Sequence, residues 1–200
     1  MDVVYYSEEL PCMIEMAGRL GMKQLMIIGG PAKELQKLQQ STPVTLVSMA
    51  SCTAATLSRI RKDEWCIASP EKACAEHPRV AALIGGETLE RKDKLHQKNS
   101  GMNMVVATTA ARHGKVLLLD ASALSLDAKS RILGRLFQNA MLAKKAKLPV
   151  LVVSGARHAF QMRSVQELKA LASYLGVPPT LEHAAENALL SLLHERDASF

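Results

Sequence analysis

The sequence predicts an α/β fold, a single-domain, TIM-barrel-like (β/α) barrel with about seven parallel strands. Seven short aliphatic or β-branched runs recur along the chain, segments of helical length separate them, and no linker or low-complexity tract divides residues 1–200. Such continuous apolar runs are typical of parallel strands, because helices cover these strands and leave neither face to solvent. About seven βα units in 200 residues favour a compact barrel over an open doubly wound sheet.

The expected strands are short, and each is followed by a segment of helical period. They are Asp2 to Tyr6, Gln24 to Ile28, Val44 to Met49, Trp65 to Ala68, Ala82 to Ile84, Val116 to Asp120 and Val150 to Val153. Two helix starts carry local signals. Pro70 follows Ser69 as an expected first helical residue, and Ser164 with Glu167 forms a capping box that satisfies two backbone amides.

Composition indicates a globular protein of a reducing compartment. With 200 residues and 48% hydrophobic side chains, the chain can bury a full core without a disulfide. Its cysteines form no C-x-x-C pair, so we expect reduced core thiols at Cys12, Cys52, Cys66 and Cys74. The first residues do not have the pattern of a secretory signal, and no run approaches the roughly 18 apolar residues of a membrane span. We expect a cytoplasmic protein without a membrane partner.

Charge is distributed unevenly along the chain. Between Asp127 and Glu167 there are thirty-nine residues without a carboxylate. The same stretch holds eight basic side chains: Lys129, Arg131, Arg135, Lys144, Lys145, Lys147, Arg157 and Arg163. A surface usually mixes both signs, so a stretch of one sign favours a polyanionic partner such as nucleic acid. A solvated surface whose basic residues only maintain solubility is the alternative.

Much of this charge is expected on one long helix, from about Asp127 to Lys147. Its apolar stripe comprises Ile132, Leu133, Leu136, Phe137 and Ala140, and the opposite side carries Arg131, Arg135, Gln138 and Lys145. At 1.5 Å per residue the helix is roughly 30 Å long, so one face could reach several phosphates.

Residues suited to catalysis are sparse. The six histidines are scattered without an H-x-H or H-x-x-x-H pair, so we predict no metal site, no catalytic group and no bound cofactor. Ser154 and Gly155 follow the last strong strand, where barrel enzymes hold their active sites, but Ser154 lacks the base that a nucleophile needs. We interpret this loop as a close-approach point for a polyanion, with Arg157 and Arg163 as bidentate anion ligands.

Residues 100 to 195 contain a series of segments in a specific order. They are Ser100 to Asn103 before a helix, the strand Leu117 to Asp120, Arg135 to Asn139 leading into Leu142 to Lys145, the strand and S-G-A loop of Pro149 to Ala156, Met162 to Ser164, and a helix that ends at Gly176. In this order they resemble the archaeal ribonuclease P protein component 3. Asp2 and the segment Arg91 to Asp93 are also similar to that family, whereas the remaining N-terminal residues match less well.

The resemblance implies a metal-free barrel related to the polymerase-histidinol-phosphatase type. It also implies a subunit of ribonuclease P, the ribonucleoprotein that removes the 5′ leader of precursor tRNA and whose RNA performs the cleavage. The implied partners are the ribonuclease P RNA, precursor tRNA through the holoenzyme, and protein component 2 with other protein subunits.

For contacts to this RNA we expect two groups of residues. The first is the loop of Ser154, Gly155, Arg157 and Arg163, and the second comprises Lys129, Arg131, Arg135, Lys144, Lys145 and Lys147. Since aromatic residues are only 4% of the chain, we expect RNA shape and charge to dominate over base stacking. A metal-dependent barrel phosphoesterase and a barrel that binds an anionic small molecule are the alternatives.

Overall fold

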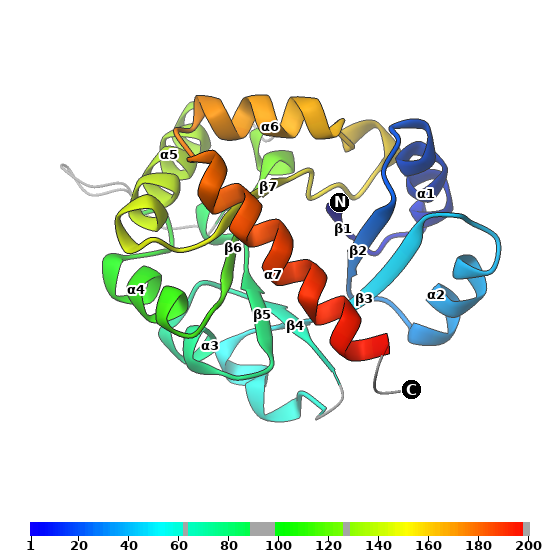
Figure 1. Cartoon of the computed structure of the whole chain (residues 1–200), viewed down its shortest axis with the longest axis horizontal. Helices are drawn as coiled ribbons and strands as arrows, with labels where there is room; N and C mark the ends of the chain where they lie inside the picture. Colours follow the sequence, from blue (N-terminus) through cyan, green and yellow to red (C-terminus); the bar gives the residue numbers. More distant parts are fainter. Residues whose placement is uncertain (62–63, 89–98, 126–128, 198–200) are drawn as a thin grey trace.

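The computed structural model describes residues 1–61, 64–88, 99–125 and 129–197, and all their side chains except those of 129–130 and 193–197. Within these ranges seven parallel strands form one sheet in the order of the sequence, with helices around its outside (Figure 1). The strands are β1 (Asp2–Tyr5), β2 (Gln24–Ile28), β3 (Thr45–Cys52), β4 (Cys66–Ala68), β5 (Val80–Leu83), β6 (Val116–Asp120) and β7 (Val150–Val153). The predicted α/β barrel of about seven parallel strands is confirmed.

β1 and β4 differ from the expected ranges by one residue at one end, whereas β3 and β5 differ by more because of their neighbours. β3 continues to Cys52 because it pairs with β2 through Thr45 to Met49 and then with β4 through Ala50 to Cys52. β5 begins at Val80, which pairs with Cys66 next to a register shift in β4. Pairing across strands, which the sequence pattern does not reveal, therefore sets these ends.

The barrel closes between β1 and the segment that follows β7. The Gly155 amide donates a hydrogen bond to the Val3 carbonyl at 3.0 Å, and the Tyr5 amide donates one to the Ala156 carbonyl at 2.9 Å. Val4 and Ala156 form a parallel bridge. Since β7 itself ends at Val153, β1 is shifted past the carboxyl end of β7, while it pairs along its whole length with β2. The segment after β7 therefore lies against β1 at the carboxyl end of the barrel.

Alternate residues of the strands pack on opposite sides of the sheet. Met26, Leu118 and Leu151 belong to the inner core, whereas Leu25, Leu117 and Val150 pack outward under helices. The helices are α1 (Leu10–Arg19), α2 (Ala32–Gln39), α3 (Lys72–Glu76), α4 (Met104–Arg112), α5 (Lys129–Ala146), α6 (Val165–Tyr174) and α7 (Pro179–Asp197). The capping box of Ser164 is present, while the helix expected after Ser69 begins only at Lys72. Cys12 is exposed, so its predicted place in the core is wrong; the other three cysteines are buried.

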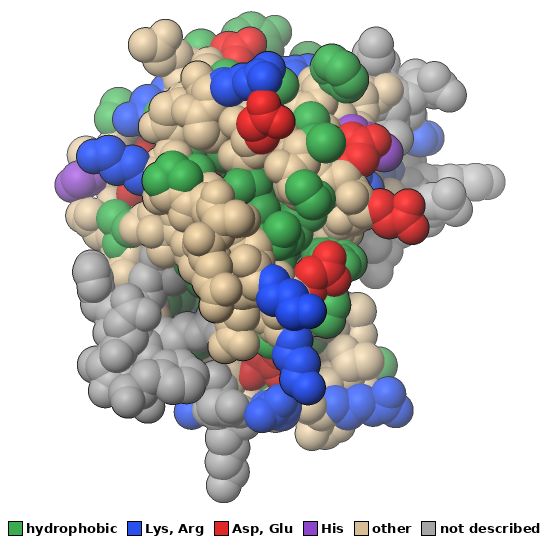
Figure 2. Space-filling model, turned by 90° about the vertical axis from the view of Figure 1, so that its right-hand side faces the viewer, with side chains coloured by type: hydrophobic (Ala, Val, Ile, Leu, Met, Phe, Trp, Pro, Cys, Tyr) green, Lys and Arg blue, Asp and Glu red, His purple; other side chains and the backbone are tan. Residues whose placement is uncertain are grey.

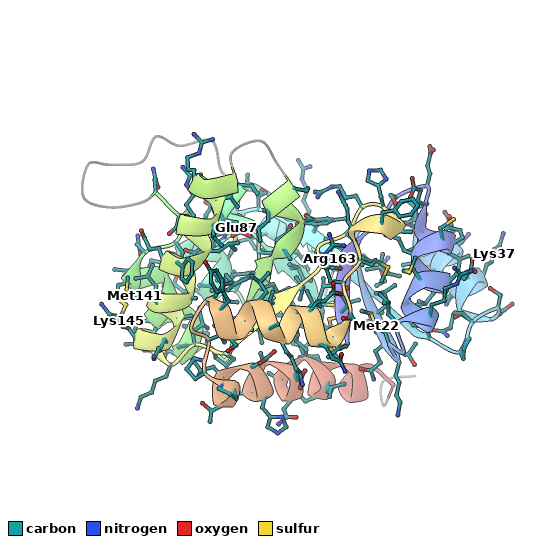
Figure 3. The ribbon with its side chains drawn as sticks, turned by 90° about the horizontal axis from the view of Figure 1, so that it is seen from above. Met22, Lys37, Glu87, Met141, Lys145 and Arg163 are labelled. Atoms are coloured by element: carbon teal, nitrogen blue, oxygen red, sulfur yellow. The ribbon has the colours of Figure 1, made fainter. Side chains whose placement is uncertain are left out.

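The last helix, α7, covers the amino end of the barrel. Ala185 and Leu189 are fully buried in the inner core, where Ala188 and Leu192 also pack. Met1 and Trp65, which precede β1 and β4, pack against the same core. Figure 3 shows α7 along one side of the barrel, with Glu87 toward the other. The carboxyl end of the barrel is thus the end that α7 leaves uncovered.

The buried face of α5 differs in part from the predicted one. Ile132, Leu136 and Ala140 are buried as expected, but Arg135 is only 2% exposed and Phe137 lies at the surface with 37% exposure. The expectation that Arg135 lies on an exposed basic face is therefore wrong. The η2 turn (Gly86–Thr88) packs against this flank of α5, and Arg135 Nη1 donates to the Glu87 carbonyl at 3.0 Å. A backbone carbonyl from another βα unit thus accepts a hydrogen bond from this buried guanidinium and offsets part of the cost of its burial.

We predict that Arg135→Gln destabilises the protein, whereas Arg131→Gln does not. Loss of the buried guanidinium leaves the Glu87 carbonyl without this donor, which costs on the order of 1–3 kcal/mol. Arg131 is exposed on the same helix, so its substitution should change the free energy of unfolding by less than about 0.5 kcal/mol. Urea denaturation of both variants checks this difference, and equal stabilities would contradict the burial of Arg135.

Candidate functional site

The carboxyl end of the barrel gathers polar side chains from four segments. Tyr5 ends β1, Glu87 lies in η2 after β5, Asp120 ends β6, and residues 154–163 form the loop after β7. This is the end where barrel enzymes hold their active sites, because the loops there carry side chains from several strands to one place. We define these residues as the carboxyl-end site.

Ser154 links the first and last strands of the barrel through hydrogen bonds to Asp2. The Ser154 amide and the Val3 amide each donate to Asp2 Oδ1 at 2.8 Å, and the Ser154 hydroxyl donates to Asp2 Oδ2. Both residues are fully buried. Ser154 was predicted as an RNA contact, and the structure instead gives its buried side chain a role in linking the first strand to the last.

Burial also shifts the titration of Asp2. Desolvation raises the pKa of the Asp2 carboxyl to about 6, although the hydrogen bonds from Ser154 and Val3 oppose this change. Asp2 follows the outward direction of Val4, whereas Asp120 follows the inward direction of Leu118. The two aspartates therefore lie on opposite faces of the sheet and do not form a catalytic pair.

Gly155 allows the Asp120 carboxylate to pack against the backbone. Its φ of +58° lies in the left-handed region, and a Cβ atom at this position would collide with Asp120 Oδ1. Gly155 is buried, so the close approach predicted for this glycine is occupied by Asp120 from the same chain. The Ser122 amide and hydroxyl donate to Asp120 Oδ1 at 2.8 and 2.7 Å, which fixes the carboxylate.

Glu87 is the second buried carboxyl group of the site. It is 1% exposed, and its Oε1 accepts a hydrogen bond from the Asp120 amide at 3.1 Å. Burial, followed by the negative charge of Asp120, raises the pKa of Glu87 to about 7; burial also raises the pKa of Asp120. Glu87 was not among the site residues predicted from the sequence, although an acid directly after the Gly85–Gly86 turn at the end of a strand is a signal that could have revealed it.

Arg157 lies over the mouth of the barrel. Its guanidinium carbon is 3.8 Å from the centre of the Tyr5 ring, and its positive charge lowers the pKa of Asp120 against the effect of burial. The Ser7 hydroxyl donates to the Arg157 carbonyl at 2.7 Å, and the Arg157 amide donates to Gln161 Oε1 at 2.8 Å. Arg157 is exposed, as predicted, while its position is held by the segment between β1 and α1.

Arg163 lines a hollow of about 480 Å³ near the same loop. The polar lining comes from Ser122, Ser125, Gln161, Arg163 and Glu167, above an apolar floor that includes Leu168 and Leu171. Arg163 Nη1 donates to the Phe160 and Met162 carbonyls, each at 2.9 Å. Its guanidinium is exposed, so Arg157 and Arg163 both present positive charge at the carboxyl end.

The remaining basic residues do not form one surface with this loop. Helix α5 runs back along the barrel, so Arg131 in its first turns lies at the carboxyl end and Lys144, Lys145 and Lys147 lie at the amino end. All four are exposed; the side chain of Lys129 lies outside the described residues. The predicted basic surface is therefore divided into two groups, separated by roughly 20 Å of helix.

An apolar patch occupies the outer side of α5 between these groups. Phe137 and Tyr174 make an edge-to-face contact with ring centres 5.3 Å apart, and Met141 lies one turn after Phe137. These side chains are 37%, 64% and 48% exposed, respectively. Figure 3 shows Met141 beside Lys145 on the outer side of the helix. We call Phe137, Met141 and Tyr174 the α5 patch.

A second hollow, of about 560 Å³, lies between α1 and the end of α2. Its lining is largely apolar and includes Ile14, Leu38 and Val44. Figure 2 shows this side of the molecule, where hydrophobic side chains gather in the middle of the face and charged ones surround them. Because its lining holds only one acid and one base, Glu15 and Arg19, which pair with each other at 2.6 Å, we do not assign chemistry to it.

The donor set at the carboxyl-end site does not fit a zinc centre. Among the described residues, no three His, Cys, Asp or Glu side chains come together as metal ligands. The guanidinium group of Arg157 supplies positive charge near Asp120. None of the helices in the described ranges is long and apolar enough to span a membrane.

The solved structures that share this fold include two whose functions differ. A chain in the cryo-EM structure of archaeal ribonuclease P with mature tRNA matches 98% of this chain and 91% of its own length, with a TM-score of 0.74 and 18% identity. The crystal structure of histidinol phosphate phosphatase from Lactococcus lactis, complexed with zinc, L-histidinol and phosphate, matches 88% of this chain and 94% of its own, with a TM-score of 0.62 and 12% identity. No protein-family model and no curated protein sequence matches the chain. At these identities the likeness concerns the fold, and it agrees with the barrel type that the sequence predicted.

We predict that the Asp2 carboxyl makes the stability depend on pH. Its pKa is raised from 3.8 to about 6 in the folded state, so the folded protein binds more protons than the unfolded chain between these values. The free energy of unfolding should therefore fall as pH rises from about 4 to about 6. Urea titrations at several pH values should show a flatter profile for Asp2→Asn in this window, and an unchanged slope would contradict the assignment.

We also predict that Gly155→Ala is far more destabilising than Gly176→Ala. Both glycines have a positive φ, but a Cβ at Gly176 meets nothing within 4 Å, whereas one at Gly155 meets Asp120. The left-handed conformation alone costs about 1–2 kcal/mol for alanine. Thermal and urea unfolding of the two variants separates this cost from the collision; equal losses would show that Asp120 moves away freely.

Proposed function

We propose that this chain is a protein subunit of ribonuclease P that binds the catalytic RNA and does not itself cleave it. The observation that carries the proposal is the shared fold with a chain of archaeal ribonuclease P over 98% of the present sequence. The resemblance of residues 100–195 to protein component 3 supports the same assignment independently of the fold.

The charge at the carboxyl end supports RNA binding there. Arg131, Arg157 and Arg163 are exposed, whereas Glu87 and Asp120 are at most 4% exposed and present little negative surface. Planar guanidinium groups bind phosphate with two hydrogen bonds, which suits contacts to an RNA backbone. We assign this group to the ribonuclease P RNA and retain Lys144, Lys145 and Lys147 as a second phosphate-binding group.

A metal-dependent phosphoesterase is the second candidate, because the histidinol phosphate phosphatase of known structure has the same fold. The geometry favours it less. Glu87 is buried and accepts a hydrogen bond from the Asp120 amide, Asp120 is bound by Ser122, and Asp2 faces away from both. Because these carboxylates already make hydrogen bonds within the barrel, we assign no catalytic role to the chain.

The proposal includes a protein partner, component 2 of the same complex, and contact with precursor tRNA through the assembled enzyme. The α5 patch is the surface we assign to a protein partner, because large apolar side chains in contact with one another on a surface are typical of protein interfaces. Thiol groups without disulfides agree with a cytoplasmic location.

Reconstitution of precursor-tRNA cleavage tests the proposal directly. Ribonuclease P RNA and the other protein subunits should cleave better with this chain than without it, and the chain alone should cleave neither precursor tRNA nor a phosphomonoester. Activity of the chain alone that disappears on chelation of metal would favour the phosphoesterase instead.

Salt dependence of RNA binding identifies which basic group contacts the phosphates. For Arg157→Gln with Arg163→Gln, the plot of log affinity against log salt should flatten by up to about 0.9 for each lost contact, because fewer counterions are released. Lys144→Gln with Lys145→Gln removes the same charge at the other end of the barrel, and a flatter slope in this variant would assign phosphate contacts to the second group as well. An unchanged slope in the arginine variant would refute the carboxyl-end assignment.

A further inference from the structure

Phe160 is the most exposed large apolar side chain among the described residues, with 90% of its surface accessible. It lies in the centre of the short η4 helix (Ala159–Gln161), three residues after Arg157 and three before Arg163. An isolated phenylalanine at this exposure contributes nothing to the core. Its neighbours Ala159 and Met162 pack instead against the cluster that contains α1.

The backbone that carries Phe160 is held at both ends. The Ala159 amide donates to Glu9 Oε2 at 3.4 Å, and His158 Nδ1 lies 3.1 Å from Glu9 Oε1. The Phe160 carbonyl accepts from Arg163 Nη1, and Met162 is only 5% exposed. The aromatic ring therefore lies on a loop that these contacts already hold in place. Binding of a ligand to the ring should then cost little conformational entropy of the chain.

The charges around the ring distinguish between possible ligands. Arg157 and Arg163 are exposed on either side, while the nearby acids are engaged: Glu9 with His158 and Ala159, and Glu167 with Ser164. A protein that inserted an apolar side chain here would need acidic groups around it. A nucleic acid satisfies both requirements, because its bases stack on aromatic rings and its phosphates bind guanidinium groups.

We propose that Phe160 is a stacking platform for an unpaired base of RNA, with Arg157 and Arg163 bound to the flanking phosphates. The inference deepens the proposed function and rests on it. A paired base in a duplex cannot reach the ring, because both of its faces are covered by neighbouring bases. The hollow lined by Gln161 and Arg163, of about 480 Å³, lies within the size range of small-ligand sites and provides room for the adjoining nucleotide.

The test compares Phe160→Ala with Val105→Ala, which shortens another exposed apolar side chain, on α4. Affinity is measured for a single-stranded oligoribonucleotide and for an RNA duplex of the same length. Stacking on one aromatic side chain should account for an approximately 5- to 150-fold loss with the single strand in Phe160→Ala, with the salt slope unchanged. Arg157→Gln should instead reduce that slope by about 0.7. Val105→Ala should bind both RNAs as the wild type does.

A fluorescent variant gives an independent readout. The chain holds one tryptophan, Trp65, so Trp65→Phe combined with Phe160→Trp places the sole indole in η4. The single-stranded oligoribonucleotide should quench its emission, and the duplex should not. Thermal melting should be unchanged in Phe160→Ala because the ring makes no core contact.

Three results would overturn the inference. Equal single-strand affinity in Phe160→Ala and wild type would remove the stacking role while leaving RNA binding and the proposed function intact. Loss of binding to another protein subunit, with RNA binding retained, would make Phe160 a protein-docking residue. Absence of RNA binding by the wild-type chain, both alone and in the reconstituted enzyme, would contradict the proposed function itself.

Discussion

The hydrogen bonds that join β1 to the segment after β7 close the barrel, and the position of every group at its carboxyl end depends on them. Asp2 receives the Ser154 amide and hydroxyl, while Gly155 pairs with Val3 and packs against Asp120. A buried carboxylate is costly unless several donors satisfy it, so these partners must all be present together. The closure therefore fixes where the chain leaves the barrel and where the loop of Arg157 and Arg163 begins.

In the same arrangement the buried acids make structural hydrogen bonds, while the arginines of the loop remain exposed. Glu87 and Asp120 hold the ends of neighbouring βα units together within the mouth of the barrel. Arg157 lies above them on the Tyr5 ring and partly offsets their charge. The carboxyl end of the barrel thus presents guanidinium groups and one exposed aromatic ring, and the proposed binding of RNA rests on these groups.

The strands could be predicted from the sequence because each is a short aliphatic run buried on both faces, such as Gln24 to Ile28. Side-chain roles on helices were harder to predict. On α5 a helical wheel placed Arg135 outside and Phe137 inside, since it could not include the η2 turn that packs beside Arg135. The structural role of Ser154 could not be predicted, because its partner Asp2 lies 152 residues away in sequence. The division of the basic residues likewise follows from the direction of α5, which charge counting along the chain does not contain.

Cross-linking of the reconstituted ribonucleoprotein measures the central claim most directly. Ultraviolet irradiation with RNA, followed by mass spectrometry of the protein peptides, identifies which residues lie against nucleotides. The account predicts cross-linked peptides from residues 154–164, at the carboxyl end of the barrel. Cross-links confined to α7 and the amino end, with peptides from residues 154–164 unmodified, would contradict it.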